Sequence, residues 1–87
     1  MSYKVIFTKQ AQKDAKKLAS AGLKNNAVKL LAILKENPYQ TPPHFEKLVG
    51  NLSGSYSRRI NIQHRLVYQI LNDDNVVKVL KMWSHYE

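Results

Sequence analysis

The stretch YSRRINIQHRLVYQILNDDNVVKVLKMW, residues 56–83, decides the fold of this chain. It contains three runs rich in β-branched and aromatic residues, at residues 56–60, 65–71 and 76–83. Short polar segments separate the runs, and strands joined by such short turns pair with their neighbours along the chain. The stretch therefore predicts an antiparallel β-meander.

The segment before the meander predicts one strand followed by two helices. Residues 3–8 are an aromatic and β-branched run, which indicates a strand. From Thr8, whose hydroxyl can cap a helix, small and apolar residues recur at helical spacing over residues 11–18. A second apolar stripe over residues 23–34 ends before Pro38, because proline cannot continue a helix.

This order of elements predicts an α+β fold in one domain, residues 1–87. An N-terminal strand and a helical hairpin would pack on a mostly antiparallel four-stranded sheet, in the order β-α-α-β-β-β. Residues 38–43 carry three prolines and predict a loop that continues into residues 44–48. The second face of the sheet would be open and would carry the arginines, so it is a predicted RNA cleft.

The chain is strongly basic, and its arginines are concentrated in one place. Fourteen Lys and Arg against six Asp and Glu give a net charge of +8, which attracts nucleic acids or acidic proteins. All three arginines lie between Arg58 and Arg65, whereas the eleven lysines are scattered. Because the guanidinium group binds phosphate oxygens in a bidentate way, this cluster predicts a phosphate-binding region in the meander.

The composition argues against several other classes of site. The absence of cysteine excludes disulfides, thiolate zinc sites and thiol nucleophiles. His44, His64 and His85 lack the short spacings of zinc ligands, and no phosphate-binding glycine loop is present, so we expect no metal and no cofactor. With no apolar run long enough for a signal peptide or a membrane span, we expect a cytoplasmic protein without membrane contact.

RNA cleavage by its own 2′-hydroxyl requires a base, cations that stabilise the charge on the phosphate, and an acid. The chain offers Glu46 as a base, the three arginines as cations, and His85 with Tyr86 near its end. Each element alone also has a simpler explanation, such as a solvated loop carboxylate or a surface histidine. Arg58 and Arg59 are neighbours in a predicted strand and point to opposite faces, so at most one should reach a shared cleft.

Four motifs resemble the Txe/YoeB toxins of bacterial toxin–antitoxin systems. They are EKL at residues 46–48, NLSGSYSRRIN at residues 51–61, HRLVY at residues 64–68 and HY at residues 85–86. The resemblance covers the C-terminal half, while the N-terminal strand and helices agree in length and order. The wider relatives are the RelE-like ribosome-dependent ribonucleases, which share the predicted architecture.

The resemblance implies a role for each matched position. Glu46 matches the general base, Arg65 the phosphate-stabilising arginine, and His85 the general acid. Tyr86 matches a terminal aromatic residue beside the scissile bond. Lys47 and Arg59 match supporting basic positions. Apart from the resemblance, Arg58 of the arginine cluster is also expected to bind phosphate.

The same resemblance implies an endoribonuclease that cuts messenger RNA in the ribosomal decoding site without a metal and thereby inhibits translation. A cognate antitoxin of the YefM/Axe type, with a flexible acidic tail, would inhibit the enzyme. Homodimer formation is a further possibility that the sequence does not decide. Two alternatives also stay open: a noncatalytic basic RNA-binding module, and a subunit whose basic face binds an acidic protein. Glu46 separates the first alternative from the nuclease, because a pure binder would not need this repelling carboxylate.

The turn at residues 72–75 decides whether Arg65 and His85 can share one face of the sheet. A three-residue loop would place Arg65 opposite Lys81 and on the face of His85. A symmetric four-residue loop would pair Arg65 with Met82 and send His85 to the other face, unless a β-bulge intervenes. The catalytic hypothesis therefore requires the three-residue loop or a bulge.

Overall fold

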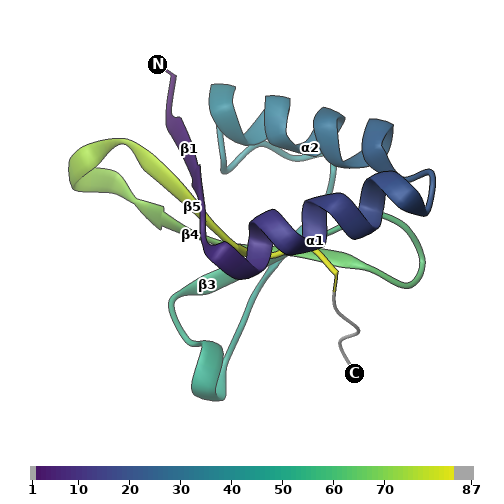
Figure 1. The fold of residues 1–87 in the computed structure, drawn as a ribbon. Coiled ribbons are helices and arrows are strands. Elements are labelled where there is room, and N and C mark those ends of the chain that lie inside the picture. Colours follow the sequence, from purple (N-terminus) through teal and green to yellow (C-terminus); the bar gives the residue numbers. More distant parts are fainter. Residues whose placement is uncertain (1, 84–87) are drawn as a thin grey trace.

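Two helices lie across one face of a five-stranded sheet (Figure 1), which confirms the predicted α+β class. The computed structural model describes residues 2–83. In chain order the elements are β1 (Lys4–Phe7), α1 (Lys9–Ser20), α2 (Lys24–Glu36), β2 (Phe45–Lys47), the 3-10 helix η1 (Gly50–Leu52), β3 (Ser55–Arg59), β4 (Arg65–Leu71), the 3-10 helix η2 (Asn72–Asp74) and β5 (Val76–Lys81).

The sheet has the strand order β1-β5-β4-β3-β2. β3, β4 and β5 form the predicted antiparallel meander, and β1 joins β5 in parallel. The prediction of four strands was wrong by one, because Phe45–Lys47 pairs antiparallel with β3 as β2. Three residues are too few to show a strand period, so only the pairing with β3 identifies this edge strand.

Thr8 joins the end of β1 to the start of α1, as its position predicted. Its Oγ1 accepts a hydrogen bond from the backbone N–H of Ala11 at 3.1 Å and donates one to the carbonyl oxygen of Leu80 at 2.9 Å. The cap therefore also ties α1 to β5. Asp14, although only 1% exposed, adds a second tie, because its carboxylate accepts the backbone N–H of Met82 at 3.0 Å.

The hydrophobic core lies between the helices and the inner face of the sheet. α1 contributes Ala11 and Leu18, and α2 contributes the predicted stripe, of which Leu30 and Leu34 are buried. The sheet completes the core with the buried side chains of Leu66, Tyr68, Val77 and Val79. Within residues 2–83, neither helix has the length and apolar character needed to cross a membrane.

The connection between β4 and β5 is the symmetric four-residue loop. Leu71 pairs with Val76, which leaves residues 72–75 in the turn, and Asn75 adopts a left-handed conformation with φ 52°. Asparagine tolerates this conformation better than most residues because its short side chain bonds locally. The three-residue loop that would place Arg65 opposite Lys81 is therefore wrong.

A β-bulge in β5 corrects the register that the turn sets. Tyr68 pairs with Val79, but the preceding residue Val67 pairs with Lys81, so β5 has one extra residue at this point. The extra residue brings Lys81 to the same face as Val67 and, by alternation along β4, the same face as Arg65. The bulge that the catalytic hypothesis allowed is therefore present.

Candidate functional site

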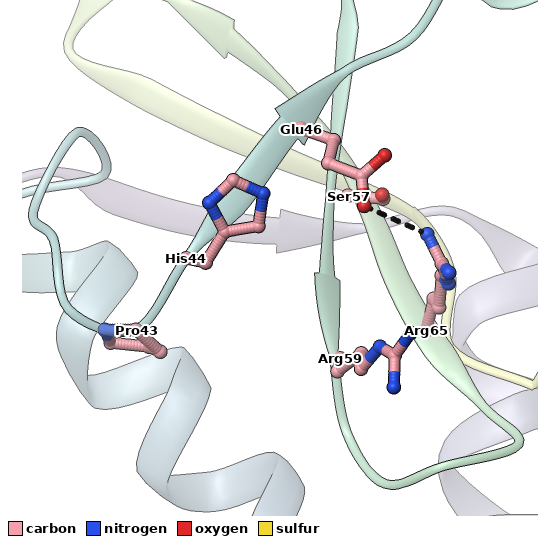
Figure 2. A pocket seen from close by; sticks show the side chains of 6 residues that line it. All are labelled: Pro43, His44, Glu46, Ser57, Arg59 and Arg65. Atoms are coloured by element: carbon pink, nitrogen blue, oxygen red, sulfur yellow. Dashed lines mark hydrogen bonds and ion pairs between the residues drawn. The ribbon is translucent and has the colours of Figure 1, made fainter.

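A cavity of about 330 Å³ lies on the face of the sheet that the helices leave open. Figure 2 shows its lining side chains, which are Pro43, His44, Glu46, Ser57, Arg59 and Arg65. They come from the end of the proline loop and from β2, β3 and β4. The cavity thus gathers a carboxylate, two guanidinium groups, an imidazole and a hydroxyl from residues up to 21 positions apart in sequence.

Strand register explains why these side chains share a face. Glu46 pairs with Ser57, and Arg59 pairs with Arg65, so each pair projects to the same side of the sheet. Like charges directly opposite one another across two strands destabilise a sheet. An anion bound between Arg59 and Arg65 would relieve this repulsion, and a phosphate group fits the geometry of guanidinium donors.

Glu46 and Arg65 form an exposed ion pair. The distance from Arg65 Nη1 to Glu46 Oε1 is 3.4 Å, drawn as the dashed line in Figure 2. The Glu46 side chain is 52% exposed and the Arg65 side chain is 21% exposed. Exposed pairs of this kind contribute only about 0–1 kcal/mol, so the pair can open at little cost when a ligand enters.

Arg58 has a structural position, which corrects its assignment as a phosphate-binding residue. It is 1% exposed and lies on the helix-facing side of the sheet. Its guanidinium donates to Tyr68 Oη at 3.0 Å, to the Pro43 carbonyl at 2.7 Å and to the Pro38 carbonyl at 2.8 Å. The guanidinium carbon also lies 4.9 Å from the centre of the Phe45 ring.

The Arg58 contacts clamp the proline loop against β3 and β4. Because this loop leads directly into β2, the clamp also sets where Glu46 stands. The expectation that at most one of Arg58 and Arg59 reaches the cleft agrees with this arrangement, in which Arg59 is exposed at the cavity.

Among the remaining assigned residues, Lys47 is described by the structure and does not line the cavity. Lys47 is exposed and pairs with Tyr56, so alternation along β2 directs it to the face opposite Glu46. His85 and Tyr86 lie outside the described residues, and their roles stay predictions. Among residues 2–83, no three His, Asp or Glu side chains come close enough to hold a metal ion.

Two cavity residues had no place in the sequence-based site. His44 was weighed only as a metal ligand, although it immediately precedes β2 and lines the cavity. Ser57 is 2% exposed, and its Oγ has no hydrogen-bond partner within the part of the chain that the structure describes. A buried hydroxyl without a partner is rare and requires an explanation. Only the pairing of Ser57 with Glu46 could have revealed it.

One family model matches most of the chain. Residues 7–86 match the family model described as the YoeB-like toxin of bacterial type II toxin-antitoxin systems. The chain is 40% identical over 58 residues to Toxin YoeB of Mycobacterium bovis, an alignment covering 67% of this chain and 66% of that protein. The chain thus aligns with just under two thirds of the length of this curated relative.

Two solved structures from Staphylococcus aureus are similar over nearly the whole chain. The YoeB dimer is 35% identical with a TM-score of 0.81, and the alignment covers 99% of this chain and 100% of that chain. YoeB in the YoeB-YefM complex is also 35% identical, with a TM-score of 0.77 and the same coverage of 99% and 100%. The described fold is therefore shared with both structures.

Substituting the two neighbouring arginines should separate structure from ligand binding. We expect Arg58→Met to lower the free energy of unfolding by at least about 3 kcal/mol, because hydrogen bonds to charged groups contribute about 1.5–3 kcal/mol each. The exposed Arg59→Met should stay within about 0.5 kcal/mol of the wild type. Urea denaturation measures both values. Equal stability of the two variants would contradict the clamp.

Burial raises the pKa of Tyr68 above its usual value of 10.0, although Arg58 opposes the shift. The neutral phenol therefore contributes stability that is complete below the pKa of the unfolded chain, about 10, and is lost as pH rises through the folded pKa. We expect the stability of the wild type relative to Tyr68→Phe to decline above about pH 10. Denaturation at a series of pH values measures the difference in the free energy of unfolding. Tyr39→Phe removes an exposed tyrosine hydroxyl and is the control, because this variant should still lose stability relative to Tyr68→Phe above about pH 10. A constant difference between wild type and Tyr68→Phe would oppose the assignment.

Proposed function

The chain belongs to the YoeB-like toxin family of bacterial type II toxin–antitoxin systems, and we propose that it is an endoribonuclease that cleaves messenger RNA on the ribosome. The observation that carries the proposal is the open-face cavity in which Glu46 stands beside the facing pair Arg59 and Arg65. A site for phosphate alone would gain nothing from a carboxylate, which repels the ligand. A site for RNA cleavage needs a base next to its cations.

In the proposed reaction, RNA opens the weak ion pair between Glu46 and Arg65. Glu46 accepts the proton of the 2′-hydroxyl, and the 2′-oxygen forms a bond to phosphorus. Arg65 and Arg59 stabilise the negative charge that builds up on the phosphate oxygens. The bond from phosphorus to the 5′-oxygen breaks, and His85 protonates that oxygen, as the resemblance implies. The products are a 2′,3′-cyclic phosphate and a 5′-hydroxyl, and no metal takes part.

Ser57 has a proposed part in the same reaction. Its buried hydroxyl stands opposite Glu46 in the sheet and lacks a partner among the described residues. Ser57 is the residue of β3 that pairs with Glu46, so both side chains project from the same face of the sheet. We propose that it donates a hydrogen bond to the Glu46 carboxylate and holds it toward the 2′-hydroxyl. Ser57 would therefore be a positioning residue.

The family resemblance implies dependence on the ribosome, and the small, exposed site is consistent with it. A positioned acid or base contributes about 10²- to 10⁴-fold to a rate, whereas holding the reacting atoms in line contributes about 7–11 kcal/mol. The cavity has few walls to bend an RNA strand into line. We propose that the ribosome supplies this geometry and the chain supplies charge and proton transfer, in the cytoplasm where ribosomes translate.

Two protein partners belong to the same proposal. The similar YoeB of Staphylococcus aureus is known both as a dimer and in complex with YefM. We propose that this chain likewise binds a cognate antitoxin of the YefM/Axe type and can form a homodimer. Its net charge of +8 favours an antitoxin with an acidic tail.

Removing the Glu46 carboxylate tests the nuclease against the RNA-binding module. We expect Glu46→Gln to lower cleavage of ribosome-bound messenger RNA at least about 10²-fold, the contribution of one positioned base. RNA affinity should stay equal or rise, because a repelling charge is lost. The exposed Glu36→Gln removes the same charge from α2 and should leave cleavage unchanged. Tight RNA binding without any cleavage by the wild type would instead establish the binding module.

Ser57→Ala should separate stability from activity. Removing a buried hydroxyl that has no partner should leave the free energy of unfolding unchanged or raise it, because its desolvation is no longer a cost. Single-turnover cleavage on saturated ribosomes should slow by about tenfold, the value of one lost hydrogen bond of about 1–1.5 kcal/mol. If Ser57→Ala cleaves at the wild-type rate, the hydroxyl has no part in the reaction.

A further inference from the structure

The exposed side of α1 carries a stripe of lysines that the proposed reaction does not use. Lys9, Lys13, Lys16 and Lys17 are all exposed and recur at helical spacing, so they lie within an arc of about 100° on the helix. We call this stripe the α1 lysine ridge. Over residues 2–83, none of its members forms an ion pair. The only acid of α1, Asp14, is buried and holds the backbone of β5.

The ridge is unfavourable for an isolated helix. Lys9 and Lys13, and Lys13 and Lys17, are four residues apart, a spacing at which like charges repel. Exposed helix faces commonly place acids at this spacing, which turns the repulsion into attraction. α1 has no acidic residue in its first turn and none on this face. A bound polyanion would turn the repulsion among the lysines into attraction.

The C-terminal end of the ridge borders a surface hollow of about 440 Å³. Lys16, Lys17, Ser20, Ala21 and Trp83 line it. The Trp83 ring is held by stacking on His64, with ring centres 3.9 Å apart and planes 20° from parallel. A fixed aromatic ring beside two lysines is the combination that binds a nucleotide, since the ring stacks on a base while the amines attract its phosphate.

Residues adjacent in sequence connect the hollow with the candidate cavity. His64, which stacks on Trp83 at the hollow, directly precedes Arg65, which lines the cavity. Lys81, two residues before Trp83, shares the sheet face of Arg65. Cationic side chains therefore lie at the cavity, at the end of β5 and at the C-terminal end of α1.

We propose that the α1 lysine ridge and the Trp83 hollow form a second RNA-binding site, which holds a phosphate backbone outside the cleavage cavity. The inference rests on the proposed action on RNA. The ridge spans eight residue steps, or about 12 Å, at 1.5 Å per residue. That length covers three or four phosphates of a stacked strand, at about 3.4 Å each.

An amphipathic protein segment fits this surface less well than RNA does. Protein interfaces bury an apolar centre, but the outer face of the ridge is formed by lysines. An apolar groove lies elsewhere, between α2 and β1, and is lined by Val5, Phe7, Leu31 and the 52% exposed Val28. The structure thus separates this apolar groove from the lysine ridge.

The test compares two triple variants with the same change in charge. Lys13→Gln/Lys16→Gln/Lys17→Gln removes three of the four ridge lysines, and Lys4→Gln/Lys29→Gln/Lys35→Gln removes three exposed lysines elsewhere. Both carry Glu46→Gln so that bound RNA stays intact. The slope of log affinity against log salt should become less steep by about 2 in the ridge variant, because each lost phosphate contact of single-stranded RNA reduces its magnitude by about 0.7. The control variant should keep the wild-type slope.

Trp83 provides a direct signal, because it is the only tryptophan of the chain. RNA should change its fluorescence in the control variant and leave it nearly unchanged in the ridge variant. The titrations use a short single-stranded RNA and intact ribosomes as separate ligands. A loss with both ligands assigns the substrate strand to the ridge, and a loss with ribosomes alone assigns ribosomal RNA; either supports the site.

Two outcomes would overturn the proposal. Equal salt slopes for the ridge and control variants would show that the ridge contacts no phosphate. If the ridge variant loses binding only to a polyglutamate peptide and not to RNA, the ridge binds an acidic protein instead. Cleavage is scored separately with Glu46 intact. A chain that binds RNA through the ridge but never cleaves would refute the nuclease and leave this site standing.

Discussion

The buried guanidinium of Arg58 is the interaction on which the arrangement of the site depends. A buried charge is costly unless its hydrogen bonds are satisfied, so the fork of Arg58 specifies where its acceptors must lie. Those acceptors are the carbonyls of Pro38 and Pro43 and the hydroxyl of Tyr68. They belong to the proline loop and to β4, and the loop leads straight into β2. Through this clamp, a core residue sets the position of Glu46.

The sheet divides neighbouring residues between structure and chemistry. Arg58 and Arg59 are adjacent in β3, yet one lies in the core and the other lines the cavity. Alternation of side chains along a strand makes this division unavoidable. The bulge between β4 and β5 also decides which face a side chain occupies. The turn at Asn75 alone would place Lys81 on the face opposite Arg65, and the extra residue of the bulge returns Lys81 to the face of Arg65.

The proposed chemistry suits a chain of this size. The Glu46–Arg65 pair is exposed and weak, so its members can serve as base and cation once RNA is held in place. An 87-residue chain has little surface with which to bend an RNA strand by itself. A second phosphate contact along the α1 lysine ridge would add affinity and orientation without enlarging the core. The ribosome would then supply the remaining geometry.

The sequence alone determined the α+β class, the helix cap at Thr8, the meander and the family, because these depend on local periodicity and on short motifs. It also predicted that Arg58 and Arg59 would diverge, although not which of them would be buried. Only the tertiary structure decided that Arg58 is a clamp, that β2 is a strand, and that Ser57 stands buried opposite Glu46. These outcomes depend on which backbone atoms from distant segments meet. The three residues of β2 are too few to show a strand period, and the residue type of Arg58 does not reveal which carbonyl groups it will contact.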